Sequence, residues 1–474
     1  MKSSNKKISV FELSVLLVYF ILSGFVIFQS IIYKIIPFKY IVVAAIFLVC
    51  VGFIVIALAM KKNLKILRKC FLILVCVCLV IANLYLFLTK KTFVEIGDDS
   101  KEYTEFSVIV LAENPAENME DVIDDSFGHV VNESDQNVQK CIDQINSDFN
   151  TTIYEVVYET YDDLSNDLYY GNVNAIIINE AFRSMIEDIY PDFNQETKVI
   201  STFKFTTEHE STKKSVDVRE ESFIIYVSGI DTYGSLSTVS RSDVNKLLVV
   251  NPNTHKMLIV SIPRDFYIPQ VCQGYQSDKL SHTGVFGVGC TVDSVGEYLG
   301  FDINYNIRLN FSSLERVVDT LGGINVYSNF SLYEASTGIS IQEGMQHMDG
   351  RTALRFVRER KLLPNGDRGR IANQSVALEA IINKILSPSI LINYISFLDS
   401  LHDSFEMNMS SDELAELVNI QLDGMGQWEF EQYSLNGYDS SNYSPLLNSN
   451  QYMMIPDLNT VQEAQRLIQA VMNE

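Results

Sequence analysis

Arginines gather in one short stretch of this chain. Six of them fall within twenty residues: Arg351, Arg355, Arg358, Arg360, Arg368 and Arg370. Two more, Arg241 and Arg264, stand beside the ends of predicted strands. A solvated charge run would mix Lys with Arg, whereas the planar guanidinium fork binds phosphate oxygens bidentately. The pattern favours a phosphate-binding site, and the alternative is a set of salt bridges to the chain's many acids.

Aspartates accompany these arginines at short spacings. They are Asp231 in Gly229-Ile230-Asp231, Asp243 in Arg241-Ser242-Asp243, Asp265 directly after Arg264, and Asp367 three residues before Arg370. Carboxylates beside arginines can bind a divalent cation that bridges to phosphate, and Mg²⁺ prefers such hard oxygen ligands. Because phosphoryl transfer needs mainly charge neutralisation and positioning, arginines and a metal together indicate chemistry on a pyrophosphate.

The elements that must position these groups alternate between strand-like and helix-like patterns. Apolar runs predict strands over 223–227, 246–250, 257–261 and 324–327, and a polar turn at 251–254 joins the second and third as a hairpin. Helical patterns follow from 312 or 313 to 321, over 352–360 and over 376–386, and a late strand at 428–430 and a helix at 461–471 complete the region. A mixed sheet covered by helices is the expected architecture.

An acidic region precedes this one. Strand patterns at 106–111 and 175–178 alternate with helical patterns at 138–149 and 181–189, so a small α/β unit is expected between about residues 104 and 212. Residues 208–221 are polar and charged and predict a linker. The unit carries no catalytic motif and is interpreted as an accessory domain, either a partner-docking surface or a brake on the active site.

The first ninety residues are strongly apolar. Three runs, residues 13–33, 40–60 and 70–88, are each about long enough for a transmembrane helix and contain no charged residue. Basic residues precede the first run and fill the loop between the second and third, so the positive-inside rule predicts a cytoplasmic N-terminus and an exterior location for everything after residue 88. A cleaved signal peptide is the alternative interpretation of the first run.

Charge divides the chain sharply. Residues 1–91 hold twelve Lys and Arg and one acid, Glu12, which leaves 24 bases and 58 acids in the remainder, a net charge of −34. Such a surface repels nucleic acid, so direct DNA binding is excluded as a function class.

Cysteine usage predicts neither a disulfide framework nor a zinc site. The predicted exterior contains Cys141, Cys272 and Cys290. Cys272 and Cys290 can pair around one loop, and the alternative is that all three are free thiols.

A series of short motifs runs through the arginine-rich region in order. They are Gly229-Ile230-Asp231, Arg241-Ser242-Asp243, Ile262-Pro263-Arg264-Asp265, Asp278-Lys279-Leu280-Ser281-His282, Asn310-Phe311, Leu321-Gly322-Gly323-Ile324, Asp349-Gly350, the run from Ala353 to Arg360, Gly366-Asp367-Arg368-Gly369-Arg370, and Gln374. In this order they resemble the LytR-CpsA-Psr family, and the resemblance covers about residues 222–386. The three apolar runs and the acidic region are similar, in architecture alone, to the streptococcal capsule-associated (CpsA-type) members.

The resemblance implies a role for each matching residue. Asp231 and Asp243 match the family's Mg²⁺-binding acids, with Mn²⁺ as an alternative metal. The residues that hold the pyrophosphate of a polyprenyl carrier are matched by Arg241, Arg264, Arg358, Arg360, Arg370 and Gln374. Asp367 matches an acid that orients those arginines. Arg264, Asp231 and Asp367 are accordingly the expected catalytic residues.

Some positions have no assignment from the family. Many members carry Arg two residues after the first Asp, where this chain has Tyr233, so one phosphate contact or gating residue is expected to differ. Arg351, Arg355 and Arg368 match no firm family role and are interpreted as structural or surface residues. The sequence does not identify the general base, because Asp231 can accept a proton only where the metal leaves it free.

The resemblance also implies the overall organisation. The family fold is an α/β/α sandwich whose apolar cleft takes the prenyl chain. We therefore expect a cytoplasmic N-terminus and three transmembrane helices over 1–91, an extracytoplasmic accessory α/β domain over 92–215, and a catalytic domain over 216–474. The protein would be a multi-pass protein of a Gram-positive-type cell membrane.

The implied activity is transfer of a glycan from a polyprenyl-pyrophosphate carrier to peptidoglycan. Capsular polysaccharide is the first expected cargo, with teichoic acid or another wall glycan next. The expected partners are the lipid-linked glycan, peptidoglycan, the membrane and, in addition, other capsule-assembly proteins.

Two other functions would use the same residues. A hydrolase would pass the glycan to water, and a lipid-pyrophosphate sensor would regulate capsule assembly without turnover. The paired acids favour an enzyme over the sensor, because a pure binder needs no metal placed in this way.

Overall fold

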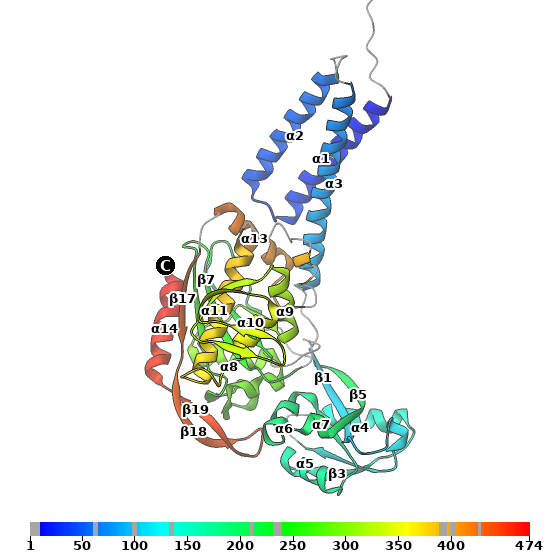
Figure 1. Cartoon of the computed structure of the whole chain (residues 1–474), viewed down its shortest axis with the longest axis vertical. Helices are drawn as coiled ribbons and strands as arrows, with labels where there is room; N and C mark the ends of the chain where they lie inside the picture. The colour runs from blue at the N-terminus through cyan, green and yellow to red at the C-terminus, as the bar shows by residue number, and fades with distance from the viewer. Residues whose placement is uncertain are drawn as a thin grey trace, which may run out of the picture.

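The computed structural model describes residues 10–59, 65–96, 102–131, 137–207, 213–230, 239–387, 396–398, 400, 404–424 and 428–474. Three apolar helices stand at one end of the molecule, a six-stranded sheet with its helices lies next to them, and a five-stranded sheet with its helices lies at the far end (Figure 1). We call the two sheet-containing parts the six-stranded unit (described residues of 213–474) and the five-stranded unit (described residues of 102–207).

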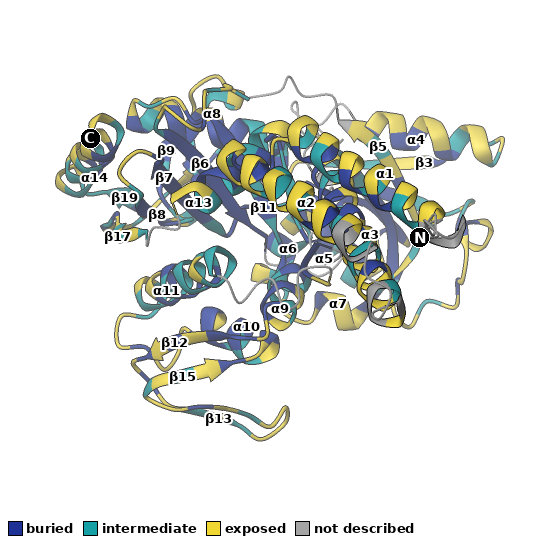
Figure 2. Cartoon of the chain, turned by 90° about the horizontal axis from the view of Figure 1, so that it is seen from above, coloured by how far each residue is buried: buried dark blue, intermediate teal, exposed yellow. Residues whose placement is uncertain are grey.

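The apolar segment forms helices α1 (Val10–Tyr33), α2 (Phe38–Ala59) and α3 (Lys65–Ile96). By length and composition, Leu13–Tyr33 and Lys69–Glu95 are long and apolar enough to cross a membrane, whereas the apolar stretch of α2, Phe38–Ile54, is shorter. Large apolar side chains are exposed along all three helices, which are largely yellow in Figure 2. The structure thus gives two candidate membrane helices, and a third crossing by α2 stays a prediction.

The five-stranded unit alternates strands and helices, as predicted. Its strands, in the order β3-β2-β4-β1-β5, are β1 (Glu102–Leu111), β2 (Ser126–Val130), β3 (Tyr154–Tyr158), β4 (Ala175–Asn179) and β5 (Thr197–Thr207). Its helices are α4 (Asn137–Asp148), α5 (Tyr161–Tyr170), α6 (Arg183–Ile189) and α7 (Phe193–Glu196), with single turns η2 (Met119–Asp121) and η3 (Glu180–Phe182). Every residue of β4 is buried, and one apolar cluster covers each face of the sheet.

The six-stranded unit is built on a mixed sheet. Its strands, in the order β16-β11-β6-β7-β8-β17, are β6 (Phe223–Gly229), β7 (Val244–Asn251), β8 (Lys256–Ile262), β11 (Tyr305–Leu309), β16 (Glu406–Met407) and β17 (Glu429–Ser434). The predicted hairpin is the antiparallel pair β7–β8, while β11 runs parallel to β6 and β17 parallel to β8. Strands β6, β7 and β8 consist mostly of apolar residues because both faces of the sheet are covered.

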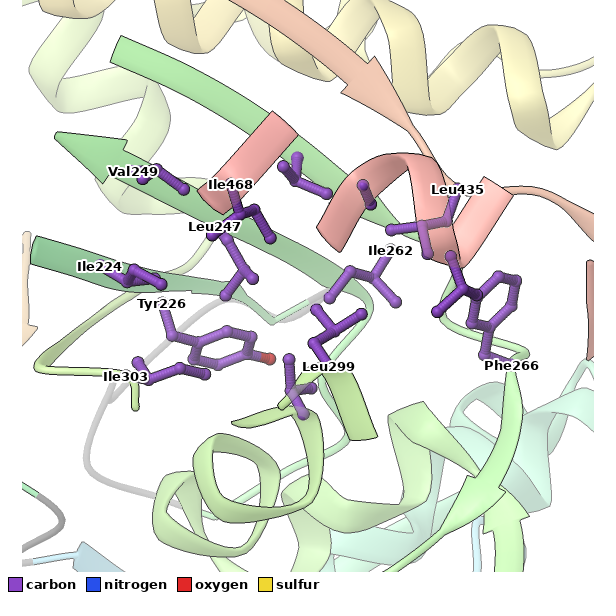
Figure 3. Close-up of a cluster of buried hydrophobic side chains, with 14 of the residues drawn as sticks. Ile224, Tyr226, Leu247, Val249, Ile262, Phe266, Leu299, Ile303, Leu435 and Ile468 are labelled. Carbon is purple, nitrogen blue, oxygen red and sulfur yellow. The ribbon is translucent and has the colours of Figure 1, made fainter. Parts of the chain in front are cut away.

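Helices cover both faces of this sheet. On one face, α8 (Val288–Leu299) and α14 (Leu458–Asn473) pack on Tyr226, Leu247 and Ile262 (Figure 3). On the other face lie α11 (Asp367–Leu386) and α13 (Ser411–Gly424), with α9 (Phe311–Thr320) and α10 (Gly350–Arg358) beside α11. The mixed sheet between two helical layers agrees with the expected α/β architecture.

Short elements complete the six-stranded unit. They are the turns η4 (Val271–Gln273) and η5 (Leu280–Phe286) and the strand pairs β9 (Tyr267–Pro269) with β10 (Ser277–Lys279), β12 (Ile324–Ser328) with β15 (Gly344–Met348), β13 (Leu332–Glu334) with β14 (Ile339–Ile341), and β18 (Gly437–Ser444) with β19 (Ser449–Pro456). A disulfide between Cys272 and Cys290 ties η4 to α8 and settles the open pairing.

Among the helix boundaries that differ from the sequence prediction, two position residues of the arginine-rich region. Helix α11 begins at Asp367 rather than at residue 376, because Gly366 with φ 53° turns the chain and Gly369 allows close contact with Leu363. A glycine in the first turn hides the helical pattern, since it lowers helix propensity. Helix α10 ends at Arg358, so Arg360 lies in the loop that follows.

Candidate functional site

A cavity of about 480 Å³ opens between the six-stranded sheet and helices α9, α10 and α11. Its charged and polar lining includes Asp188, Arg241, Asp243, Lys246, Arg264, Asn310, Arg355, Arg358, Glu359, Arg360, Lys361, Arg370 and Gln374. Its apolar lining includes Val227, Ile230, Val244, Leu309, Phe311, Leu314, Val317, Val357, Ala377, Leu378, Ile381 and Phe405. One cavity therefore combines a cationic region with a wall suited to a hydrocarbon chain.

Asp243 is the centre of the cationic region. The carboxylate lies just before β7 and Arg264 just after β8, so the antiparallel hairpin brings both to the same edge of the sheet. Arg264 Nη1 donates to Asp243 Oδ1 at 2.5 Å, and Arg241 Nε lies 3.3 Å from the same oxygen. Burial alone would raise the pKa of Asp243, but Arg241 and Arg264 hold it below its usual value, so the carboxylate stays ionised.

Helix α11 supplies the opposite wall of the cationic region. Arg370 Nη2 lies 2.6 Å from Asp367 Oδ1, three residues earlier in the first turn of the helix. Gln374 lines the cavity one turn beyond Arg370, because residues four apart share a face. Burial lowers the pKa of Arg370 and Asp367 opposes that effect, and an arginine remains cationic at neutral pH in either case.

Three of these arginines have a donor that makes no hydrogen bond, although Arg241 Nε lies within ion-pair distance of Asp243. Among the described residues, the Nε atoms of Arg241, Arg264 and Arg370 are buried and make no hydrogen bond. A buried unsatisfied donor costs about 1–3 kcal/mol, and more when it is charged. An anionic ligand with several oxygens would satisfy them, so the cluster has unfilled donor capacity for phosphate.

Arg358 and Arg360 line the cavity from the end of α10 and the loop beyond it. Both are exposed. The Arg358 guanidinium lies 4.1 Å from the centre of the Phe311 ring on α9, a cation–π contact that fixes its position beside the cavity.

Lys246 lies on the cavity floor, beneath the first turns of α11. Its Nζ atom donates to Ser261 Oγ at 2.7 Å, Ser375 Oγ at 2.8 Å and the Ile371 carbonyl at 3.2 Å. The side chain is almost fully buried, and burial lowers the pKa of Lys246 to about 7. Lys246 thereby ties α11 to β7 and β8, the strands next to Asp243 and Arg264.

The structure brings most of the predicted site residues together. Those that line one cavity are Arg241, Asp243, Arg264, Arg358, Arg360, Arg370 and Gln374, and Asp367 contacts Arg370. Asp231 and Tyr233 lie outside the described residues. Of the arginines without a family role, Arg355 lies 2.7 Å from Glu359 and also lines the cavity, Arg368 donates to the Gly437 carbonyl, and Arg351 is exposed.

Sequence reasoning missed three residues of the cavity. Lys246 carried a signal, because it is a charged residue at the edge of an apolar strand pattern. Glu359 lies in the motif from Ala353 to Arg360, but its sequence position indicates no role for it. In the structure it is buried and paired with Arg355. Asp188 lies in the five-stranded unit, and nothing local in the sequence connects it to residues more than fifty positions away.

Known proteins are similar to about half of this chain. The LytR_cpsA_psr family model matches residues 190–468. A polyisoprenyl-teichoic acid–peptidoglycan teichoic acid transferase, TagU, of Enterococcus faecalis is 32% identical over 238 residues, which cover 49% of this chain and 77% of the relative. TagU of Bacillus subtilis is also 32% identical over 238 residues, covering 48% of this chain and 75% of the relative.

Solved structures of similar proteins include TagT bound to LI-WTA, with 27% identity, a TM-score of 0.44, and coverage of 55% of this chain and 94% of that one. The family model spans more than half of this chain, and the chain covers more than two thirds of the TagU relatives. The chain is a member of the LytR_cpsA_psr family.

Proposed function

We propose that this protein is a membrane-anchored, extracytoplasmic phosphotransferase that moves a glycan from a polyprenyl-pyrophosphate carrier to peptidoglycan. Capsular polysaccharide is the proposed cargo, with another anionic wall glycan such as teichoic acid as the alternative. The proposal divides the chain into a membrane part over 1–91 with a cytoplasmic N-terminus, an accessory domain over 92–215 and a catalytic domain over 216–474. The names of the TagU relatives support a polyisoprenyl-linked donor and a peptidoglycan acceptor.

One observation carries the proposal. Three arginines, each with a buried Nε atom that makes no hydrogen bond within the described residues, lie around Asp243 in the same cavity as a dozen apolar side chains. A pyrophosphate needs the first feature and a prenyl chain needs the second, and a lipid-linked donor combines both groups in one molecule.

The proposed reaction is an attack on the phosphorus next to the glycan. An acceptor hydroxyl oxygen forms the new bond to phosphorus, the bond from phosphorus to the bridging oxygen breaks, and lipid monophosphate leaves with that oxygen. Arg264 and Arg370 would stabilise the charge that grows on the leaving phosphate. Asp367 would orient Arg370, which lies 2.6 Å away. The hydroxyl proton passes to a base, for which Asp231 is the proposed residue where it is free of metal.

We propose that a divalent cation binds beside Asp243 when the donor is present. Mg²⁺ binds proteins through one or two carboxylates together with substrate phosphates, so Asp243, with Asp231 as the second proposed ligand, meets its requirement. Within the described residues no group of three His, Cys, Asp or Glu is suited to hold a metal without such a substrate. When bound, Mg²⁺ or Mn²⁺ would neutralise charge on the phosphate oxygens.

The test uses the full-length protein in detergent micelles with Mg²⁺, a labelled polyprenyl-pyrophosphate-linked glycan and peptidoglycan fragments. We expect label to become covalently attached to peptidoglycan, and Arg264→Ala to lower the rate by about 10²–10³. Asp243→Ala should also remove activity. Arg351→Ala is the matched control, because Arg351 is exposed on α10 and is not among the described cavity-lining residues.

Each alternative function has its own result. Free glycan and lipid phosphate, with no peptidoglycan adduct at any acceptor concentration, would indicate a hydrolase. Tight donor binding with no metal-dependent turnover would indicate a sensor. Loss of folding in Arg264→Ala, with Arg351→Ala still folded, would show that Arg264 serves structure and not catalysis.

A further inference from the structure

An acidic side chain of the five-stranded unit reaches the proposed catalytic cavity. Asp188, at the end of α6, lines the cavity together with the arginines of the six-stranded unit. Arg241 Nη1 donates to Asp188 Oδ2 at 2.7 Å. The same guanidinium lies 3.3 Å from Asp243 through its Nε atom, so Arg241 bridges carboxylates from two different units.

The position of Asp188 is fixed by packing between the units. Phe182 and Met185, in η3 and α6, are buried in a cluster with Val285 and Leu446 of the six-stranded unit. The turn that contains Leu446 joins β18 to β19, and in Figure 1 this hairpin extends from the six-stranded unit to α6. A backbone hydrogen bond from Val239 to the Tyr103 carbonyl, at 3.0 Å, adds a second link. Asp188 is therefore held at the cavity by an apolar interface and not by the ion pair alone.

Asp188 differs from the other acids that line the cavity. The described acidic lining residues are Asp188, Asp243 and Glu359. Asp243 and Glu359 are buried and neutralised by arginines of their own unit. The Asp188 side chain is 62% exposed, and the residue lies just before the segment that the family model matches, 190–468. The glycan of a bound donor would have to extend from the cavity into solvent, and Asp188 is the exposed acid of the described cavity lining.

This charge acts differently on the pyrophosphate and on the glycan. Because the Asp188 carboxylate is exposed, solvent weakens its ion pair with Arg241, and a pyrophosphate held by several arginines would displace it. The displaced carboxylate would stay at the edge of the cavity, because the packing of Phe182 and Met185 holds α6 there. An acidic group on the sugars next to the pyrophosphate would then lie close to the Asp188 carboxylate, and repulsion between these two negative charges would oppose binding.

We propose that Asp188 is a specificity-determining residue, which selects donors whose sugar units next to the pyrophosphate are uncharged and disfavours donors with uronic acid or glycerol-phosphate units there. The inference rests on the proposed function and narrows its substrate class. It also means that the five-stranded unit supplies one wall of the donor site.

The experiment uses two donors with the same polyprenyl pyrophosphate, one with two neutral hexose units first and one with two hexuronic acid units. The full-length protein in micelles is compared with Asp188→Asn and Glu187→Gln. Glu187 is the matched control, because it precedes Asp188 on α6, accepts a hydrogen bond from Asn194 and is not among the described cavity-lining residues. Both donor affinity without acceptor and kcat/KM with peptidoglycan fragments are measured.

We expect the wild type to prefer the neutral donor by roughly three- to tenfold, since charges a few ångströms apart near a surface interact by about 1 kcal/mol or more. In Asp188→Asn the ratio of neutral-donor to charged-donor affinity should fall close to one, because only the affinity for the charged donor increases. Glu187→Gln should keep the wild-type ratio. The Asp188→Asn effect should shrink at high salt.

Three results would overturn the inference. An unchanged ratio in Asp188→Asn would show that the carboxylate does not contact the glycan. Equal improvement for both donors would indicate a general brake on the site. Equal loss for both donors would indicate that Asp188 only orients Arg241. The affinity ratio needs no turnover, so absence of transfer by the wild type would count against the proposed function without deciding the role of Asp188.

Discussion

The five-stranded and six-stranded units are both mixed sheets covered by helices, but they differ in what lies between sheet and helix. In the five-stranded unit, apolar side chains such as Ile176 and Ile177 fill both faces, and each face has its own buried cluster. In the six-stranded unit one face is equally apolar, whereas the other carries Lys246 on β7 and opens into the cavity beside Asp243 and Arg264.

The difference shows what a functional cavity requires of a fold. A buried charge is tolerated only when it is paired and hydrogen-bonded, so the charges of the six-stranded unit occur as linked sets. Asp243 has two arginines, Arg370 has Asp367, and Lys246 has three oxygen acceptors. The charged pairs of the five-stranded unit, such as His129 with Glu155 and Arg183 with Glu180, are not among the described cavity-lining residues, and this unit contributes to the site through its surface, by Asp188.

The largest expected effect comes from removing the central charge of the six-stranded unit. Asp243→Asn keeps the side-chain shape but leaves Arg241 and Arg264 as neighbouring cations without their shared partner. Breaking a buried pair in this way costs about 3–5 kcal/mol. Hydrogen exchange of β7 and β8, followed by mass spectrometry on the full-length protein, should show a matching loss of protection.

Asp302→Asn makes the same chemical change at a surface ion pair and is the control. Asp302 pairs with Lys214 at 2.5 Å, and its side chain is 76% exposed, so its removal should cost less than about 1 kcal/mol. Comparable losses at the two positions would contradict the view that the Asp243 pairs are buried and structurally coupled.

The arginine-rich site was predictable from the sequence because its residues cluster in short, ordered motifs. Asp243 and Arg264 flank a hairpin whose strands were visible as apolar runs, so their meeting at one sheet edge followed from the pattern. Asp188 was not predictable, because its place depends on how the two units pack through Phe182 and Leu446. Contacts of that kind have no periodicity in the chain.

The fold was predicted in the same uneven way. The apolar strands and the alternating five-stranded unit follow from periodicity and burial. The early start of α11 does not follow from periodicity, because Gly366 and Gly369 interrupt the helical pattern. Gly366 is needed for the turn before the helix, and Gly369 allows close packing against Leu363. The Cys272–Cys290 pairing stayed open, since pairing depends on the distance between the two Cα atoms, 5.5 Å in the structure.

The disulfide gives the second prediction, because it occurs in one unit only. Cys272 and Cys290 are 18 residues apart, and closing a loop of that size stabilises a domain by about 3 kcal/mol in the chain-entropy model. Reduction should therefore lower protection of η4 and α8 in hydrogen exchange. The five-stranded unit, whose described cysteine Cys141 is buried and not disulfide-bonded, should be unaffected.

A double variant, Cys272→Ser with Cys290→Ser, separates the disulfide from other effects of the reductant. Reductant should have no further effect on it. Continued sensitivity of the variant to reductant would show that another thiol is responsible.

The third prediction concerns the pH dependence that Lys246 gives to the six-stranded unit. Burial lowers its pKa to about 7, whereas an unfolded lysine titrates near 10.5. Between these values the unfolded chain binds more protons than the folded chain, so stability should rise as pH increases from about 7. The expected gain is up to about 2 kcal/mol between pH 7 and 9.

Lys246→Met removes this titration and keeps a side chain of similar length. The rise in protection of β7 with pH should be absent in the variant, as measured by hydrogen exchange corrected for its intrinsic pH dependence. An identical pH profile in wild type and variant would mean that the ammonium keeps its proton through its contacts with Ser261, Ser375 and Ile371.

The smallest expected effect tests whether the five-stranded unit is energetically separate from the cavity of the six-stranded unit. Thr160 is the N-cap of α5, and its side chain accepts a hydrogen bond from the Asp163 amide. Thr160→Ala should weaken α5 by about 1 kcal/mol, and Thr160→Ser should preserve the cap. Because α5 is not among the described elements that line the cavity, donor affinity should stay unchanged while exchange in α5 accelerates. A parallel loss of donor affinity in Thr160→Ala, restored in Thr160→Ser, would show instead that the stability of this unit is transmitted through α6 to Asp188.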